Sequence, residues 1–333
     1  MPLLLIVLLT TALFSGCINI DINGANNTQN NTSNDLNISD SNANSTQNDT
    51  IGDTAAGGKE QISVAAFNIQ IFGVTKAEKE DVMDVLAKTI RRYDIVGIQE
   101  IRDASGTALP KLVDLINSGT DENGQPYNYD YVVSDRLGRT SSKEQYAYIY
   151  NANTVFVASE PLVYPKPDGT DPFEREPYMV TFQSKTDTFN AVFILIHTKP
   201  EDAKNEIDHL DDVVKYAKSI YAGQENYVLM GDFNADGSYF NKSGPSKLKS
   251  DDYIWIIGND VVTTTKTKYT YDRIVITPSL QPYFTSQSGV FNYSAEYGLN
   301  ATQTYAVSDH YPVYIDFWTV IGDWGRLLFR HIS

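Results

Sequence analysis

The sequence predicts an α/β protein in which mixed β-sheets pack face to face and helices cover their outer surfaces. The first supporting observation is a long series of short apolar or alternating runs, which are typical of strands. The second is that helical periodicity occurs in only a few stretches, early and midway along the chain. Many strands with few inserted helices favour packed sheets with helices outside them. The chain of 333 residues has room for one large domain with appendages, and one domain over residues 61–318 is the simplest division.

The strand predictions begin where the composition changes from polar to apolar, at residue 61. Runs rich in Val, Ile, Tyr and Phe follow one another, separated by polar or Gly-containing turns. The predicted strands are 62–67, 94–99, 127–134, 145–150, 154–164, 178–183, 189–196, 227–230, 271–277 and 313–318.

Three helices are predicted between these strands. The motifs Thr75-x-x-Glu78 and Thr198-x-x-Glu201 have the spacing of capping boxes, which predicts the start of the first and third helices. These helices extend to about residues 92 and 221. A second helix, over about 107–117, ends before Gly119.

The amino-terminal segment is typical of an exported protein. Its apolar run over residues 1–16 is shorter than the ~20 residues that span a bilayer, so a signal peptide is the better interpretation. Cys17 is the one cysteine of the chain and follows small residues in a lipobox-like context, which favours lipid attachment because no disulfide partner exists. We therefore expect a lipoprotein-type signal peptide over 1–17 with Cys17 as anchor, and a plain secreted protein is the alternative.

Residues 18–60 are predicted to be a disordered linker, because they contain too little apolar surface to fold. Six Asn-x-Ser/Thr sequons fit a glycosylated extracellular stalk, although an Asn-rich sequence also generates sequons by chance. They begin at Asn26, Asn30, Asn31, Asn37, Asn44 and Asn48. The tail over 319–333 either packs on the domain, which is the preferred interpretation, or touches a membrane.

The formal net charge of −16 argues against a basic, non-specific nucleic-acid clamp. It does not exclude an enzyme that meets phosphate groups through bound divalent cations. The acidity also fits a role in solubility alone.

Polar side chains of catalytic type lie at the ends of the predicted strands. Strand ends and adjoining loops are where rigid scaffolds display reactive groups. Carboxylate and amide oxygens suit Mg²⁺ or Mn²⁺, and histidine–carboxylate pairs suit acid–base work near neutral pH. The set therefore predicts a metal-dependent phosphoryl-transfer site with two histidines. It comprises Asn68, Glu100, Glu144, His197, Asp232, Asn234, Asp272, Asp309 and His310.

An ordered set of motifs within residues 61–318 resembles the endonuclease/exonuclease/phosphatase superfamily and, within it, the deoxyribonuclease I family. The resemblance implies a four-layer α/β sandwich of two packed mixed β-sheets flanked by helices. The matching segments are Phe67–Gly73, Gln99–Asp103, Gly138-Arg139, Lys143–Tyr146, Phe173–Pro177, Ile196–Thr198, Met230–Asp236, Tyr271–Val275 and Ser308–Pro312.

The resemblance also implies a division of labour at the site. His310 would deprotonate the attacking water and His197 would protonate the leaving 3′-oxygen, or the two roles are exchanged. Glu144 would hold His197 and Asp272 would hold His310. The ligands of Mg²⁺ or Mn²⁺ and of the scissile phosphate would be Asn68, Glu100, Asp232, Asn234 and Asp309.

DNA is the partner that the resemblance implies, bound with weak sequence preference by a monomeric enzyme. Arg102 resembles a minor-groove arginine, and Arg139 and Arg175 resemble phosphate-contacting arginines. Ser142 stands where the family usually has a groove-inserting tyrosine. The resemblance further implies a structural Ca²⁺ site, made of Asp171, Phe173 (through its carbonyl) and Glu176.

Two other functions remain open at this point. One is another phosphodiesterase of the superfamily, such as a sphingomyelinase or an inositol-phosphate phosphatase, which Arg102, Glu144 and Arg175 disfavour. The other is a surface binding module without catalysis, which has no need of two histidine–carboxylate pairs. The predicted function is thus a tethered or secreted extracellular deoxyribonuclease.

Overall fold

Two mixed β-sheets form the centre of the chain in this computed structural model, which describes residues 61–141, 143–167, 169–186 and 189–319. The predicted signal peptide, the lipid anchor at Cys17, the linker and nearly all of the carboxy-terminal tail lie outside the described residues, as does Ser142. Those predictions remain predictions. Within the described part, no helix combines the length and the hydropathy that a membrane span requires.

The first sheet has six strands. Its central pair, β1 and β2, is parallel, and the remaining neighbours are antiparallel. From edge to edge the order is β12 (Phe284–Val290), β13 (Val313–Trp318), β1 (Gln61–Phe72), β2 (Ile95–Ile101), β4 (Gln145–Asn151) and β3 (Tyr129–Val133).

The second sheet has seven strands and repeats this plan, with one parallel pair, β8 and β9, among antiparallel neighbours. The short strand β6 (Leu162–Val163) pairs with β7 beside the main order. That order is β10 (Ile254–Trp255), β11 (Asp272–Ile276), β9 (Tyr227–Asp232), β8 (Asn190–His197), β7 (Tyr178–Ser184) and β5 (Val155–Val157).

The two sheets pack against each other through alternate side chains of their strands. Val64 of β1, Tyr148 of β4 and Phe193 of β8 share one buried cluster. Gly97 of β2 marks a close approach, because a Cβ there would lie 2.6 Å from Cε of Met230 in β9. Burial of the strands on both faces explains why so many of them were visible as apolar runs.

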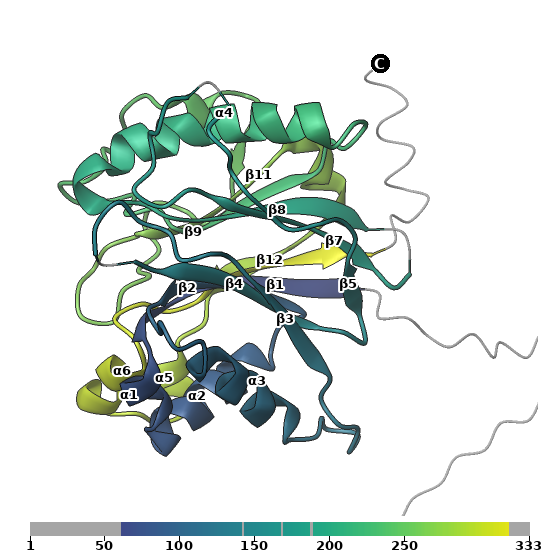
Figure 1. The fold of residues 1–333 in the computed structure, drawn as a ribbon, viewed down its shortest axis with the longest axis vertical. Coiled ribbons are helices and arrows are strands. Elements are labelled where there is room, and N and C mark those ends of the chain that lie inside the picture. Colours follow the sequence, from purple (N-terminus) through teal and green to yellow (C-terminus); the bar gives the residue numbers. More distant parts are fainter. Residues whose placement is uncertain (1–60, 142, 168, 187–188, 320–333) are drawn as a thin grey trace, which may run out of the picture. The chain divides into compact units, whose positions relative to one another are not determined.

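Helices cover the outer faces of both sheets, which confirms the predicted four-layer sandwich (Figure 1). Five helices lie on the outer face of the six-stranded sheet, and α4 (Ala203–Ile220) covers the seven-stranded sheet. The five are α1 (Val74–Ala77), α2 (Glu80–Ile90), α3 (Ala108–Asn117), α5 (Tyr293–Glu296) and α6 (Ala301–Val307). Short 3₁₀ turns occur at Pro200–Asp202, Lys247–Lys249 and Pro278–Tyr283.

Both predicted capping boxes are wrong. Thr75 lies inside the single turn α1, and α2 begins separately after the extended residue Lys79, with no side-chain cap. Thr198 precedes a 3₁₀ turn, and α4 likewise has no side-chain cap. Among the described helices, a capping box occurs at Asn300-x-x-Gln303, at the start of α6, where none was predicted.

The two parallel strand pairs bring four strand ends to the site. In β1 and β2 the register pairs Asn68 with Gln99, directly before Glu100. In β8 and β9 it pairs His197 with Asp232. Since parallel neighbours have their carboxyl ends on the same side of a sheet, each sheet presents its polar side chains together where these strands end.

Candidate active site

The ends of β1 and β2 supply an amide and a carboxylate. Past Asn68 the backbone of β1 turns through positive φ at Gln70 (42°) and Ile71 (49°), and Glu100 has a φ of 63°. These sparsely populated conformations are held by hydrogen bonds: the Gln70 amide donates to Oδ1 of Asn68 (2.9 Å), and the Ile71 amide donates to Oε2 of Glu100 (2.8 Å). From the sequence, only the polar residues Asn68 and Glu100 could be predicted here. The strained backbone became apparent only in the structure.

His197 and Glu144 form the first histidine–carboxylate pair. Nδ1 of His197 lies 2.9 Å from Oε2 of Glu144, and both side chains are buried. Glu144 precedes β4 in the six-stranded sheet, whereas His197 ends β8 in the seven-stranded sheet, so this pair bridges the two sheets. A carboxylate can only accept, so the proton is placed on Nδ1 and Nε2 faces the site.

His310 and Asp272 form the second pair. Nδ1 of His310 lies 2.8 Å from Oδ2 of Asp272, again between buried side chains. Here the histidine precedes β13 of the six-stranded sheet, and the carboxylate begins β11 of the seven-stranded sheet. The second pair therefore also bridges the sheets, in the opposite sense.

Asp232 lies between the two imidazoles. Its Oδ2 is 3.5 Å from Nε2 of His197 and 3.5 Å from Nε2 of His310. The Asn68 amide donates to the same Oδ2 (3.1 Å) and to Oε1 of Glu100 (3.1 Å). The two catalytic-type histidines and the candidate metal ligands thus converge on one carboxylate.

The electrostatics follow from this convergence. Burial lowers the pKa of His310, but Asp272 and Asp232 outweigh it and raise the pKa to about 10. For His197, burial and Arg175 oppose Glu144, and the net effect is again a raised pKa. Burial raises the pKa of Asp232, but the two histidines outweigh it and lower the pKa.

The remaining predicted metal ligands also lie here. Asn234, at a φ of 47°, donates from its backbone to Oδ1 of Asp232 (3.0 Å) and from its amide side chain to the Thr198 carbonyl (3.1 Å). Oδ1 of Asp309 is buried and has no hydrogen-bond partner among the described residues. The same oxygen lies 3.9 Å from Nε2 of His310. A buried carboxylate oxygen without a hydrogen bond fits a divalent cation. In addition, carboxylate oxygens of Asp232 and Asp272 and a ring nitrogen of His310 lie within 4.8 Å of one another, which is a spacing that could hold a metal ion.

The three predicted DNA-contacting arginines differ in exposure. Arg102 donates to Oε1 of Glu144 (2.8 Å), and its side chain is 33 % exposed. Arg139 is 43 % exposed and pairs with Asp171 at 3.2 Å. Arg175 is buried and donates to the carbonyls of His197 (3.0 Å) and Thr198 (3.4 Å), so it supports the His197 backbone and offers little surface to DNA.

The two carboxylates predicted to bind calcium, Asp171 and Glu176, lie together, but both pair with the side chain of Lys166. The Lys166 ammonium pairs with Asp171 (3.1 Å) and with Glu176. Phe173, which lies between these two residues in sequence, is fully buried, and only its carbonyl could serve as a ligand. Because a calcium ion would have to displace Lys166, these residues do not fit the ion as arranged, and the calcium site stays a prediction.

Three supporting residues were not assigned a role from sequence. The Tyr146 hydroxyl accepts from the His197 amide (2.9 Å), and the Ser308 hydroxyl donates to the Asn68 carbonyl (2.6 Å) while accepting from the His310 amide (3.0 Å). Lys76 donates to the carbonyls of Ile69 (2.9 Å), Gln70 (2.5 Å) and Val307 (2.9 Å). Burial lowers the pKa of Lys76 to about 8. These contacts join distant segments, which no local motif reveals.

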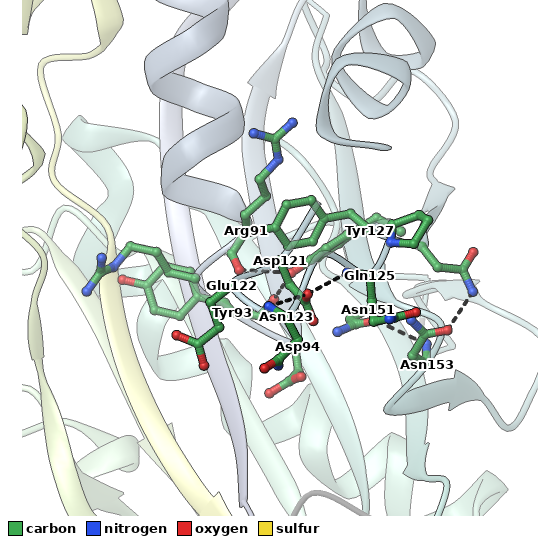
Figure 2. Close-up of a pocket in the computed structure, with 14 residues that line it drawn as sticks. Arg91, Tyr93, Asp94, Asp121, Glu122, Asn123, Gln125, Tyr127, Asn151 and Asn153 are labelled. Atoms are coloured by element: carbon green, nitrogen blue, oxygen red, sulfur yellow. Dashed lines mark hydrogen bonds between the residues drawn. The ribbon is translucent and has the colours of Figure 1, made fainter. Parts of the chain in front are cut away.

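Two cavities of the described chain lie away from this site. Figure 2 shows one of about 610 Å³ around Arg91, Asp94 and Tyr127, at the opposite end of β2 from Glu100. Arg91 there is committed to the carbonyls of Leu115 (2.6 Å) and Ile116 (3.0 Å). Another, of about 660 Å³, lies between α2 and α3. No candidate site residue lines either cavity.

Comparison with known proteins identifies the family of this chain. The family model described as "Endonuclease/Exonuclease/phosphatase family" matches residues 65–310, which contain all of the predicted catalytic and metal-binding residues. Deoxyribonuclease gamma of Rattus norvegicus is 37 % identical over 268 residues, covering 77 % of this chain and 84 % of that protein. Deoxyribonuclease-1 of Homo sapiens is 39 % identical over 266 residues, covering 77 % and 92 %.

Solved structures support the fold. A family protein from Bacteroides thetaiotaomicron superposes with a TM-score of 0.52 at 18 % identity, over 77 % of this chain and 94 % of its own. A mannosyl-6-phosphatase of the same bacterium gives 0.51 at 17 % identity, over 77 % and 99 %. At such identities the likeness concerns the fold alone.

Proposed function

Because the chain belongs to the endonuclease/exonuclease/phosphatase family, we propose that it is a deoxyribonuclease that hydrolyses phosphodiester bonds of DNA with little sequence specificity. The observation that carries the proposal is the pair of histidine–carboxylate couples that meet at Asp232. The similarity to two kinds of deoxyribonuclease selects DNA among the substrates that such a site could take.

The two imidazoles act as the acid–base pair. His197 gives a proton to the leaving 3′-oxygen. His310 would take a proton from the attacking water when a cation held by Asp232 offsets the carboxylate charge that raises the His310 pKa. Each needs its Nε2 directed at the phosphate, and the bonds from Nδ1 to Asp272 (2.8 Å) and Glu144 (2.9 Å) hold that orientation. Arg175 and Tyr146 fix the His197 backbone, and Ser308 fixes that of His310.

A divalent cation, Mg²⁺ or Mn²⁺, is part of the proposal. The ligands would come from Asn68, Glu100, Asp232, Asn234 and Asp309. Their hard oxygen donors suit such an ion, as does Oδ1 of Asp309, which is buried and has no hydrogen bond among the described residues. When bound, the cation neutralises charge that develops on the phosphate. Around it, Asn68 keeps Glu100 and Asp232 in one place by donating to both.

DNA is held by surface arginines in this proposal. Arg102, which pairs with Glu144 at the site, and Arg139, which pairs with Asp171, expose part of their guanidinium groups and contact the sugar–phosphate backbone or the groove. Such contacts confer affinity without reading bases, which accounts for low sequence specificity. The enzyme is further proposed to act outside the cell, secreted or anchored at Cys17, as a monomer.

The test is nicking of a supercoiled plasmid with Mg²⁺ by the parent and by His310→Ala. We expect the variant to nick at least about 100-fold more slowly, because an acid–base group contributes ~10²–10⁴ to such rates. His209→Ala is the matched control, since His209 lies on α4, where its Nδ1 is 2.8 Å from the Asn205 carbonyl and its ring contacts Phe173. Equal nicking by His310→Ala and the parent would overturn the mechanism, and no nicking by the parent would overturn the function.

A further inference from the structure

Three tyrosines form an aromatic group beside His310. The ring of Tyr271 lies 6.3 Å from the His310 ring, centre to centre. Tyr269 stacks on Tyr271 at 5.0 Å with an interplanar angle of 16°, and Tyr239 contacts the same ring at 5.9 Å. Tyr269 and Tyr239 are 38 % and 36 % exposed, so the group begins at the catalytic imidazole and ends in solvent.

The segment that carries Tyr269 and Tyr271 is fixed to the catalytic segment. The Thr265 amide donates to the Asp309 carbonyl (2.8 Å), and the Tyr311 amide donates to the Thr263 carbonyl (2.7 Å). Thr264 and His310 also form an antiparallel bridge. The rings therefore keep a constant position relative to His310.

Asp236 joins this segment to the one that carries Tyr239. Its carboxylate accepts from the Thr270 amide (2.9 Å) and from the Gly237 amide (2.6 Å). Lys242 pairs with the same carboxylate at 2.8 Å. A prearranged group of rings loses little conformational entropy when a ligand binds.

The charge around the rings suits a nucleic-acid strand. Lys266 and Lys268 precede Tyr269 in sequence and are exposed, in a chain whose net charge is −16. The Lys266 ammonium lies over the ring of Tyr305. Two cations and stacked aromatic rings next to a phosphodiester site are the combination with which proteins hold single strands. Exposed aromatic clusters in soluble proteins also mark binding surfaces.

We propose that Tyr269 and Tyr271 form a stacking platform for an unpaired base next to the scissile phosphate, so that single-stranded DNA is a substrate of this site. The inference rests on the proposed deoxyribonuclease function and adds a substrate class to it. A base on Tyr269 extends the existing stack outward from His310. Because every base has a flat face, this contact requires no particular sequence.

A purely structural role for Tyr269 has to be separated from the platform. Its ring covers Gly237, where an added Cβ would lie 3.1 Å from Cε1 of Tyr269. Loss of the side chain could thus destabilise the turn. Tyr269→Leu keeps apolar cover without a flat ring, and Tyr269→Phe keeps the ring without the hydroxyl.

The experiment measures kcat and KM of the full chain on a fluorescent oligothymidine and on a hairpin duplex, with Mg²⁺. We expect Tyr269→Leu to raise KM for the single strand about tenfold while KM for the duplex changes less than about twofold. Tyr269→Phe should match the parent. Phe156→Leu is the control, because Phe156 is equally exposed (36 %) on β5, at the opposite edge of the seven-stranded sheet from β10 and β11. Binding of the oligothymidine in EDTA, followed by fluorescence anisotropy, accompanies each rate.

The outcomes separate the two proposals. Cleavage of duplex with no cleavage of single strand, or an equal effect of Tyr269→Leu on both substrates, overturns the platform and leaves the deoxyribonuclease function intact. A change in melting temperature alone also overturns it. If the parent cleaves neither substrate, the proposed function fails, and the anisotropy still decides: tenfold weaker binding by Tyr269→Leu supports the platform, and unchanged binding overturns it.

Discussion

Glu144 shows how much a single side chain organises at this site. Its Oε2 faces His197, and its Oε1 lies 2.8 Å from Arg102 and 3.5 Å from Arg175. Burial raises the pKa of Glu144, but His197 and the two arginines outweigh it and lower the pKa to about 2. Glu144 therefore stays ionised over the working range of a neutral enzyme. Asp272, by contrast, has no arginine or lysine among the hydrogen-bond and salt-bridge partners that the described residues provide.

The division of labour between the histidines can be tested with a substrate that needs no acid. Replacing the bridging 3′-oxygen by sulfur gives a leaving thiolate, which departs without a proton because a thiol has a pKa near 8.5. We expect His197→Ala to be at least about 100-fold slower than the parent on ordinary DNA and close to the parent on the sulfur-linked strand. His310→Ala should be slow on both.

The measurement is single-turnover cleavage of matched oxygen- and sulfur-linked strands, with thermal unfolding as the folding control. Rescue of His310→Ala in place of His197→Ala would exchange the two roles. No rescue of either variant would contradict acid catalysis of the leaving step.

At the scale of single elements, Asp103 joins the catalytic end of β2 to α3. Its Oδ2 accepts from the amides of Thr107 (2.7 Å) and Ala108 (2.8 Å), and its Oδ1 accepts from the amide (2.8 Å) and hydroxyl (2.6 Å) of Ser105. It thus satisfies amides at the start of the helix although Thr107 occupies the cap position.

The pH dependence of stability should carry the signature of Asp103. Burial raises the pKa of Asp103, but its hydrogen bonds outweigh this and lower the pKa from 3.8 to about 2. A pKa that is lower in the folded state means a stabilisation that is present above about pH 4 and is lost as the pH falls towards 2. In Asp103→Asn an amide group replaces one of the two accepting oxygens and the charge is lost, so the change should cost about 1–2 kcal/mol at pH 7 and nearly nothing at pH 2.

Urea unfolding from pH 7 down to pH 2 measures this difference. Asp114→Asn is the control, because Asp114 is exposed on the same helix, and we expect a change below about 0.5 kcal/mol. A constant difference between Asp103→Asn and the parent at all pH values would contradict the assignment.

At the scale of the whole molecule, the packing of the two sheets depends on Gly97. A Cβ at this position would lie 2.6 Å from Cε of Met230 and 2.7 Å from Cδ1 of Leu195. Gly97→Ala should therefore lower the free energy of unfolding by about 1–3 kcal/mol through overpacking. Gly289→Ala on β12 is the matched control, since the three atoms nearest to its Cβ would belong to Tyr314, at 3.4 Å or more, which is ordinary contact. Equal stability of the two variants in urea would show that the sheets tolerate the added methyl group.

Much of this architecture was predictable because most strands are buried and long enough to leave an apolar run. Elements that escaped prediction carry little such signal: β12 reads Phe-Thr-Ser-Gln-Ser-Gly-Val and has a register shift against β13, and α5 has only four residues. The strand 154–164 proved to be two short strands, β5 and β6. The helix starts failed because a Thr-x-x-Glu spacing is common and says nothing of the backbone before it.

The site was predictable to a similar extent. Polar residues at strand ends converge because parallel pairs align their carboxyl ends, so His197 and Asp232 could be placed together from sequence. Tertiary contacts could not be foreseen in this way. Lys76 acts through three carbonyls on two distant segments, and Tyr269 acquires its neighbours only when the segment 263–271 meets residues 308–311. The burial of Arg175 was invisible for the same reason.

Each histidine–carboxylate couple joins one sheet to the other, and the two couples cross in opposite senses. The catalytic rate therefore depends on the position of one sheet relative to the other. A slip of one layer past the other by a fraction of a bond length would lengthen both couples at once, while each sheet kept its own hydrogen bonds. With rising temperature or denaturant, activity should therefore be lost before either sheet unfolds. A mutation in the core between the sheets can lower activity without contacting the site.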